Sequence, residues 1–483
     1  MTYHRHRAGA RGVPGAGGPL EKEIAIVVTT VRGRAHSFFS AHPARTVVLA
    51  FAAAVVIGTG LLMLPAAAED GAATNVLTAL FTSTSAVCVT GLAVVDTGTY
   101  WSGFGEGVIL ALIQVGGFGI MTLASLLALL VSGRLRLRLQ LTAQAETKSL
   151  GIGDVRRVLL GVAGTTLMVE LAVGALLALR FRFGYAHTIG DSVYLGFFHA
   201  VSAFNNAGFG LHADSLTRYA HDAWVTLPIA AAVILGGIGF PVLLEMLRHR
   251  NRARATGRKN WTLHTKLTVI TTVALLVTGT VLTGLMEWTN PATLGTQDLW
   301  GKLLNSFFHS AMSRTAGFNS LDVGAMHAST LLMTCMLMFV GGGSAGTAGG
   351  IKVTTFAVLA AAMLAEVRGE PTSAVLGRRL GPHVLRQALT VALLGIGLVM
   401  TAALILLSVS AASFEAVLFE VVSAFATVGL STGITADLPG SGQLVLVALM
   451  FIGRIGPITL VSALALRERT RRYELPEERP VIG

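Results

Sequence analysis

The chain has 483 residues, of which 53% are hydrophobic and 13% are charged, and its formal net charge is +11. Soluble domains usually carry about 25% charged residues, so this composition excludes an ordinary soluble globular protein. Several apolar runs are about 20 residues long, which is enough for a helix to cross a bilayer. We therefore expect an all-α integral membrane protein.

The first 44 residues form a basic, glycine-rich segment, and an apolar run follows it at residues 47–64. That run ends near three alanines, as the cleavage site of a signal peptide does. The basic segment before it is too long for a signal peptide, and the run exceeds the usual apolar stretch of about 7–15 residues. We interpret it as the first membrane span.

One short segment occurs four times along the chain. Each copy has a phenylalanine ten residues before a glycine, and a leucine or phenylalanine directly after that glycine. The copies are FTSTSAVCVTGL at residues 81–92, FHAVSAFNNAGF at 198–209, FFHSAMSRTAGF at 307–318 and FEVVSAFATVGL at 419–430. Ser85, Ser202 and Ser423 recur at one position, where Ala311 stands in the third copy. Internal repetition of this kind indicates an architecture built from one repeated unit.

Each copy lies between two long apolar runs, and each second run contains a further cluster of glycines. These clusters are GGFG at residues 116–119, GGIG at 236–239, GGGSAGTAGG at 341–350 and GRIG at 453–456. The sequence therefore predicts four tandem units, each a helix, a short re-entrant helix, an extended turn and a second helix. The units cover residues 45–133, 156–248, 263–367 and 383–466, and a short tail follows at 467–483.

The short helices are too short to span, and residues that cap helices stand near their predicted starts. These are Thr74 and Asn75, Asp191 and Ser192, Asn305 and Ser306, and Ser413. Four such units predict eight full spans around a pseudo-fourfold axis.

Most of the Lys and Arg residues lie in five clusters at the N-terminal segment, residues 134–157, 248–266, 368–386 and 467–479. The alternate connections hold most of the loop aspartates, with Arg180, Arg182, Arg218 and Lys302 as basic exceptions. Positive residues concentrate on the cytoplasmic side of a membrane. We therefore expect a multi-pass protein of the cytoplasmic membrane with both termini in the cytoplasm. This placement explains the excess of basic over acidic residues without a nucleic-acid partner.

Non-helical backbone at membrane depth is tolerated only where protein buries it or where it lines a wet cavity. Four extended turns around one axis would form rings of backbone carbonyls, which can replace the hydration shell of a cation. The short helices would direct their partly negative C-terminal ends at the same axis. This arrangement predicts a cation pore with a selectivity filter.

At these turns the sequence resembles the Trk/Ktr/HKT superfamily of potassium transporters, over about residues 45–466. The resemblance implies that potassium binds at the filter carbonyls of Val89, Thr90, Gly91, Asn206, Ala207, Gly208, Thr315, Ala316, Gly317, Thr427, Val428 and Gly429. The residues at the filter edge are Cys88, Asn205, Arg314 and Ala426. Members with serine in the first filter tend to favour sodium, so Gly91 implies selectivity for potassium.

The eight-span plan and the short tails look most like the Ktr-type (KtrB-like) membrane subunit. That resemblance implies a homodimer in membrane lipid, gated by a cytoplasmic ring of nucleotide-binding subunits of the KtrA/TrkA type. The nucleotide is expected on the partner, so this chain carries no cofactor of its own. Potassium is the transported ion, and sodium is a candidate activator.

Residues 341–355, GGGSAGTAGGIKVTT, interrupt the second helix of the third unit. An ordinary helix does not tolerate so many glycines, each costing about 1 kcal/mol relative to alanine. The resemblance implies a mobile loop that blocks the cavity beneath the filter. The candidate gate residues are Gly341, Gly342, Gly343, Ser344, Gly346, Thr347, Gly349, Gly350, Lys352 and Arg454. Arg454 lies in the middle of the last apolar run, so it should face the protein interior.

Other interpretations were weighed against this one. Residues 341–346 match the GxGxxG pattern, with Glu366 downstream, but they lack the strand-turn-helix context of a dinucleotide site. A secondary transporter with two inverted repeats would show two related halves rather than four units. A sodium-coupled or sodium/potassium secondary transporter stays the alternative function, and no arrangement of catalytic residues indicates an enzyme.

Several polar residues in the apolar regions keep two interpretations. His199 and His309 fit packing or hydrogen bonding better than proton transfer. Arg314 fits a role in pinning its loop to a neighbouring helix better than contact with the ion. Asn205 and Asn206 fit caps or cross-links. Cys88 is exposed to the filter or merely packed, and Glu170 has no assigned role.

Overall fold

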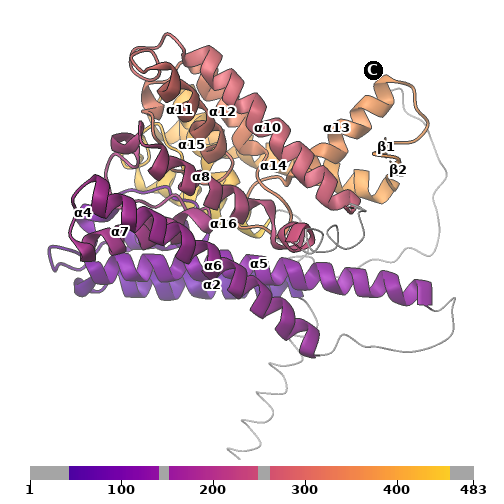
Figure 1. Ribbon diagram of the computed structural model, residues 1–483, viewed down its shortest axis with the longest axis horizontal. Helices are drawn as coiled ribbons and strands as arrows, with labels where there is room; N and C mark the ends of the chain where they lie inside the picture. The colour runs from indigo at the N-terminus through magenta and orange to yellow at the C-terminus, as the bar shows by residue number, and fades with distance from the viewer. Residues whose placement is uncertain (1–42, 141–151, 248–260, 457–483) are drawn as a thin grey trace, which may run out of the picture.

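The computed structural model describes residues 43–140, 152–247 and 261–456, and their regular secondary structure is helical apart from one short hairpin. Figure 1 shows the arrangement of the elements. The predicted tail, most of the predicted N-terminal segment and large parts of two basic clusters lie outside the described residues. Their expected place in the cytoplasm therefore stays a prediction.

The helices follow the predicted order of long helix, short helix and second helix four times. The first unit has α2 (Pro43–Leu62), η1 (Pro65–Ala67), α3 (Val76–Val87), α4 (Thr97–Tyr100) and α5 (Gly103–Gln140). The second has α6 (Ile152–Gly184), α7 (Ile189–Phe204), η2 (Thr217–Tyr219) and α8 (Ala223–Ile238). The third has α10 (Leu263–Glu287), α11 (Leu299–Met312), η3 (Val323–Ala325), α12 (Ala328–Phe339) and α13 (Val353–Val367).

The fourth unit has α14 (Pro382–Val409), α15 (Phe414–Ala426) and α16 (Gly440–Ile455). In every unit the short helix packs against the long helix before it. The short antiparallel strands β1 (Ala374–Val375) and β2 (Arg378–Arg379) form a hairpin between the third and fourth units. In Figure 1 the short helices α7, α11 and α15 lie toward one end of the molecule, and this hairpin lies at the other.

Three of the described helices are long and apolar enough to cross a membrane: Leu159–Gly184, Leu263–Glu287 and Pro382–Val409. A fourth crossing is possible if Ala223–Ile238 and Phe240–Leu247, which meet at a bend of 101°, count as one broken span. Two second helices end directly before a glycine with positive φ, α8 before Gly239 and α16 before Gly456. The prediction of eight full spans thus remains a prediction.

The starts of two short helices differ from the sequence prediction. Asn75 and Ser413 cap α3 and α15 as expected. Thr188 caps α7 and Asp298 caps α11, each accepting a hydrogen bond from a backbone N–H of the first turn. The predicted caps in these two copies, Asp191 or Ser192 and Asn305 or Ser306, lie inside the helices instead.

The apolar residues that define the repeat are core residues on either side of each turn. Phe81, Phe198 and Phe419 are fully buried before the turn. In the third copy the aligned Phe307 is only partly buried, and its neighbour Phe308 is buried in its place. The residues directly after the glycines are all at most 2% exposed: Leu92, Phe209, Phe318 and Leu430. Each turn is therefore anchored in the core at both ends, which explains its fixed length.

Candidate functional site

The four extended turns meet in a closed ring. A β carbon built on each filter glycine would lie under 3.0 Å from the carbonyl oxygen of the residue before the next filter glycine. The pairs are Gly91 with Ala207, Gly208 with Ala316, Gly317 with Val428, and Gly429 with Thr90. The order of contacts runs from the first copy through the fourth and returns to the first. Glycine is required at each position because any side chain would collide with backbone there.

All four turns have the same backbone shape. The residue two positions before each glycine has a positive φ, with values of 54° at Val89, 60° at Asn206, 72° at Thr315 and 49° at Thr427. The left-handed conformation costs a residue with a side chain about 1–2 kcal/mol. Strain of this size persists where the surrounding structure over-determines the backbone, and such positions cluster at functional sites.

Hydrogen bonds within each copy hold the turns. Thr90 N–H donates to the Ser85 carbonyl at 2.8 Å, and the equivalent bonds in the second and fourth copies measure 2.7 and 2.8 Å. In the first and fourth copies a serine hydroxyl also accepts from the glycine N–H, namely Ser85 Oγ from Gly91 and Ser423 Oγ from Gly429, both at 3.1 Å. We call this contact the serine clamp.

The serine clamp is missing from the other two copies. In the third copy Ala311 has no hydroxyl, and Gly317 N–H donates to the Met312 carbonyl at 3.4 Å. In the second copy Ser202 is present, but its buried hydroxyl has no hydrogen-bond partner in the structure. The four turns share a shape without sharing all of its supports.

An open cavity of about 330 Å³ lies directly on the ring. All four filter glycines line it, together with polar residues that include Asp96, His212, Asn319 and Ser431. The ring therefore forms the base of an open depression with polar walls.

Charged groups surround this depression outside the membrane-spanning segments. Arg218 and Asp214 form an ion pair with 2.6 Å between Nη2 and Oδ1, and the hydrogen bond from Arg218 lowers the pKa of Asp214. Burial lowers the pKa of His212, and the nearby Arg218 lowers it further. The His212 ring is therefore neutral at pH 7.

Beneath the ring, residues 340–352 connect α12 to α13 without helical structure, so the predicted loop at 341–355 ends three residues earlier than expected, where α13 begins at Val353. We call this stretch the gate segment. Gly341 N–H donates to the Ile351 carbonyl at 2.8 Å, which closes the segment on itself. Gly343 N–H and Thr347 N–H donate to the carbonyls of Gly237 and Gly236 in α8, at 2.8 and 3.1 Å.

Two arginines bind carbonyls of the gate segment. Arg314 donates from Nη1 to the Thr272 carbonyl at 2.9 Å and from Nη2 to the Gly341 carbonyl at 3.0 Å. Arg454 donates from Nη1 to the Thr347 carbonyl and from Nη2 to the Gly116 carbonyl. Both side chains are buried, at 6% and 4% exposure. Arg314 thus ties the edge of the third turn to the gate segment, and Arg454 ties the last helix to it.

Other predicted gate residues hold the segment internally. Lys352 donates from Nζ to the Ala348 carbonyl at 2.6 Å, and Ser344 and Thr354 exchange a hydroxyl contact at 3.2 Å. Gly349 lies against the fourth turn, since a β carbon there would lie 2.7 Å from the Ala426 carbonyl. The predicted filter edge and the predicted gate are therefore in direct contact.

The two asparagines of the second turn reach in different directions. Asn206 Oδ1 accepts a hydrogen bond from Thr347 Oγ1 of the gate segment at 2.8 Å. Asn205 donates from Nδ2 to Gln114 Oε1 in α5 at 2.9 Å and to Glu170 Oε1 in α6 at 3.0 Å. The sequence indicated cross-links for these amides, but Gln114 carried no signal that marked it as a partner.

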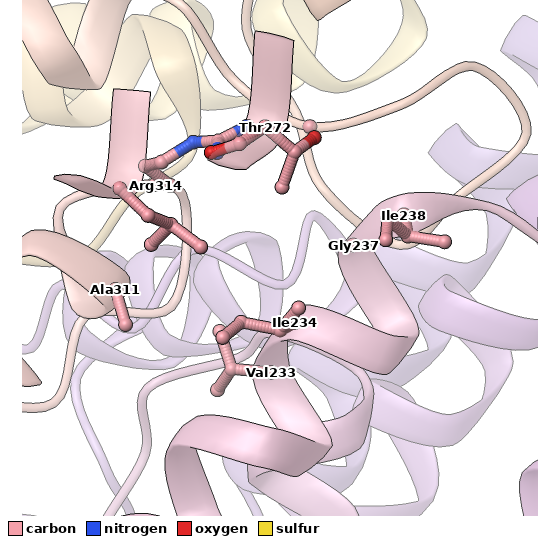
Figure 2. Close-up of a pocket in the computed structure, with 9 residues that line it drawn as sticks. Val233, Ile234, Gly237, Ile238, Thr272, Ala311 and Arg314 are labelled. Carbon is pink, nitrogen blue, oxygen red and sulfur yellow. The ribbon is translucent and has the colours of Figure 1, made fainter. Parts of the chain in front are cut away.

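A small cavity of about 20 Å³ lies beside Arg314, lined by Thr272, Gly342 and apolar residues of α8, α10 and α11. Figure 2 shows Arg314 and Thr272 at one side of this cavity, opposite Val233 and Ile234. Arg314 Nε and Thr272 Oγ1 are buried without a hydrogen-bond partner. The volume is enough for about one water molecule, which these polar atoms would hold.

The second glycine clusters let the second helices approach the short helices. A β carbon on Gly116, Gly236 or Gly453 would lie under 3.0 Å from the carbonyl oxygen of Val87, Phe204 or Phe425, respectively. Each of these carbonyls belongs to the residue four positions before a filter glycine. The matched offset seen in the sequence is therefore a matched packing contact. The third unit departs from it because its second helix is interrupted there.

The remaining candidates are buried within the helices. His199 Nδ1 lies 2.8 Å from the Leu195 carbonyl, and His309 Nε2 lies 3.0 Å from Thr334 Oγ1. Cys88 is fully buried and ends α3, where its N–H donates to the Thr84 carbonyl. Both histidines therefore have hydrogen-bond partners within the core, and Cys88 is buried at the end of its short helix.

The chain matches the family model described as "TrkH: Cation transport protein" over residues 24–470. It is 38% identical over 432 residues to the Ktr system potassium uptake protein B of Bacillus subtilis, covering 89% of this chain and 95% of the relative. It is 33% identical over 450 residues to the potassium/sodium uptake protein NtpJ of Enterococcus hirae, covering 91% and 97%.

Among solved structures, the fold is similar to the crystal structure of the potassium transporter TrkH from Vibrio parahaemolyticus. The TM-score is 0.68 at 17% sequence identity, covering 87% of this chain and 84% of the other. At this identity the likeness concerns the fold, and it confirms the predicted helical architecture.

Proposed function

Because this chain belongs to the TrkH family of cation transport proteins, we propose that it carries potassium ions across the cytoplasmic membrane into the cell. Relatives that cover nearly the whole chain are named potassium uptake proteins, which supports potassium as the ion. The observation that carries the proposal is the closed ring of four glycines and four carbonyls. A ring of this kind supplies oxygen ligands that replace the water around a cation.

In the proposed mechanism a hydrated potassium ion enters the open depression and loses water as it meets the ring. The carbonyls of Thr90, Ala207, Ala316 and Val428 take the place of that water. The ring keeps its size because each glycine packs against the neighbouring carbonyl. Discrimination against the smaller sodium ion then follows from how many carbonyls reach the ion and how strongly they bind it.

The gate segment is the proposed barrier below the filter. Its glycines give it backbone freedom, and its contacts with the second, third and fourth turns support a position under the ring. Removing part of residues 343–349 is expected to raise the ion flux of the isolated chain. A shortened protein that folds and shows no higher flux would count against a gate.

Three relatives carry the name of a Ktr system, which supports a further subunit in the working assembly. We propose that the partner is a cytoplasmic nucleotide-binding ring that opens the gate segment, and that the membrane chain is a homodimer. Light scattering of the purified chain tests the second part. A monodisperse monomer that still transports potassium would contradict the dimer.

One relative favours an alternative in which sodium takes part. The potassium/sodium uptake protein of Enterococcus hirae covers 91% of this chain. In this alternative the protein is a secondary transporter that couples potassium to sodium. Uptake that requires a sodium gradient, rather than a potassium gradient alone, would favour it.

The test of the main proposal is rubidium-tracer uptake into proteoliposomes that contain this chain, with potassium or sodium as competitor. Potassium is expected to block uptake, and sodium at the same concentration is not. Equal block by both ions would contradict a potassium filter. If no uptake occurs, the shortened gate variant decides between a closed gate and a wrong assignment.

A further inference from the structure

The second filter turn keeps the backbone bond from Ala207 N–H to the Ser202 carbonyl at 2.7 Å but lacks the serine clamp of the first and fourth turns. Ser202 occupies the clamp position, but its hydroxyl is unpartnered, and among the described residues the structure gives Gly208 N–H no hydrogen bond. The turn nevertheless has the same backbone shape, with positive φ at Asn206 and Gly208. Besides the bond from Thr347 Oγ1 to Asn206 Oδ1, the turn has one further side-chain contact from outside its copy that can take the place of the clamp.

The contact is a buried polar cluster formed by Glu170, Gln114 and Asn205. Asn205 directly follows α7 and directly precedes the strained Asn206, so its side chain is fixed at the point where the turn begins. Its Nδ2 lies 3.0 Å from Glu170 Oε1, 2.9 Å from Gln114 Oε1 and 2.9 Å from the Val201 carbonyl of its own helix. Gln114 Nε2 in turn lies 3.5 Å from Glu170 Oε2.

Glu170 is an unusual residue for its place. It lies within α6, in the stretch that is long and apolar enough to cross a membrane, and it is 5% exposed. An acidic side chain at such depth is costly and marks a functional position. Its hydrogen bonds in the described part of the chain go to Gln114 and Asn205, and no arginine, lysine or histidine pairs with it.

Glu287 offers the contrast. It is also fully buried, but its two carboxylate oxygens accept hydrogen bonds from Asn290, Thr293, Thr330 and the N–H of His327. None of these groups belongs to a filter turn. Glu287 therefore fixes the outer end of the third unit, whereas Glu170 is bonded to a filter residue.

We propose that Glu170 is a positioning residue for ion selectivity: it holds Asn205 and thereby fixes the second filter turn in the shape that the ring requires. The inference rests on the proposed function, since selectivity has meaning only if the ring is a potassium filter. Glu170 does not touch the ion. It substitutes, through Asn205, for the serine clamp that the second turn does not form.

The first experiment compares Glu170→Leu with Glu170→Gln by rubidium uptake with potassium or sodium as competitor. Leucine removes the carboxylate acceptor of α6 and leaves Asn205 with Gln114 and the Val201 carbonyl, whereas glutamine keeps an oxygen acceptor at position 170. We expect the leucine variant to lose potassium-over-sodium preference on the order of tenfold, the effect of losing one buried hydrogen bond. The glutamine variant should keep most of it. Equal losses in both variants would overturn the proposal.

Glu287→Gln is the matched control. It should lower thermal stability without changing the ion preference, because its partners lie outside the filter. A wild-type chain that does not prefer potassium would overturn the proposed function and this inference together. A selective wild type with an equally selective leucine variant would overturn this inference alone.

A paired substitution keeps the test decisive if Glu170→Leu does not fold. Asn205→Asp sets two carboxyl groups against each other and should disturb the turn. When Asn205→Asp is combined with Glu170→Gln, the amide donor is at position 170 and the carboxyl acceptor is at position 205. The hydrogen bond is then restored with the two roles exchanged. We expect the double variant to recover selectivity that Asn205→Asp has lost. A double variant no more selective than Asn205→Asp would contradict the positioning role.

Discussion

The filter turns and the gate segment are both non-helical backbone in the interior of the protein, yet they are held in opposite ways. The first and fourth filter turns are held mainly by their own copies, through bonds such as Thr90 N–H to the Ser85 carbonyl. The gate segment is held by side chains from distant parts of the chain. Arg314 comes from the third turn and Arg454 from the last helix.

The difference has a consequence for function. Local bonds to backbone are repeated along a turn, so no single side chain outside the copy controls the shape of the first and fourth turns. The gate segment depends on a few long-range bonds, which a conformational change elsewhere can break. The two regions should therefore respond differently to substitution, the filter in selectivity and the gate in basal flux.

The largest effect is expected at the first turn. Gly91 has a φ of +93°, and a β carbon would collide with the Ala207 carbonyl. Gly91→Ser should cost about 1–3 kcal/mol in strain. On this basis it should reduce potassium-over-sodium preference on the order of tenfold to a hundredfold, measured by competitive rubidium uptake.

Gly433→Ala is the matched control for this substitution. Gly433 has a φ of +99° but open space around it, just beyond the fourth turn. Its replacement imposes similar backbone strain without the collision. If Gly433→Ala changed selectivity as much as Gly91→Ser, strain anywhere near the mouth would explain the result and the ring would lose its special role.

The next effect is expected in the gate. Arg454→Gln removes the donors to the Thr347 and Gly116 carbonyls, and each unpaired buried group costs about 1–3 kcal/mol. The closed position of the gate segment should weaken. Basal rubidium flux of the isolated chain should rise about tenfold or more, while ion preference stays unchanged.

Arg218→Gln serves as the control for Arg454→Gln, since Arg218 is an exposed residue paired with Asp214 on the surface. Exposed pairs contribute about 0–1 kcal/mol, so flux and stability should hardly change. An Arg454→Gln protein with wild-type flux and wild-type thermal stability would show that Arg454 does not hold the gate segment closed.

The contrast between local bonds in the turns and long-range bonds in the gate segment explains what the sequence could predict. The four copies, their glycines and the buried residues around them follow from local pattern, because each turn is anchored by residues within about ten positions. The caps of α7 and α11 were placed too late because several candidate cap residues follow one another there.

Long-range partners left no pattern to find. Arg454 was recognisable as a buried charge, but its bond to Gly116 joins residues 338 positions apart. Glu170 was noticed and had no role, because Asn205 lies 35 positions away. Ser202 looks the same as Ser85 in sequence, and only the structure distinguishes a clamp from an unpartnered hydroxyl.

A smaller effect should distinguish the first turn, which has the serine clamp, from the second turn, which lacks it. Ser85→Ala removes the clamp on Gly91 N–H and should lower potassium preference about fivefold, in line with a net hydrogen bond of about 1 kcal/mol. Ser202→Ala removes a hydroxyl that makes no bond and should leave preference unchanged. Competitive uptake on both variants measures this, and equal losses would show that the clamp is not what distinguishes the turns.

The smallest effect is expected from pH at the mouth of the filter. Burial, followed by Arg218, lowers the pKa of His212 below its usual 6.5, while Asp214 and Asp96 oppose the shift and His187 adds to it. The His212 imidazole therefore stays neutral as pH falls to 6.5. At lower pH the imidazole takes up a proton and adds positive charge beside the ring of filter carbonyls. The folded state also loses stability, because the unfolded chain binds that proton more readily.

Rubidium uptake should therefore stay constant as the outer pH falls from neutral to 6.5 and decline only below it, by about twofold, since exposed charge near the mouth is screened by salt. His212→Gln should make the profile flat. His383→Gln, at an exposed position at the start of α14, should keep the wild-type profile. A decline that persists in His212→Gln would mean that the acid sensitivity arises in the gate or the filter itself, and that the mouth has no part in it.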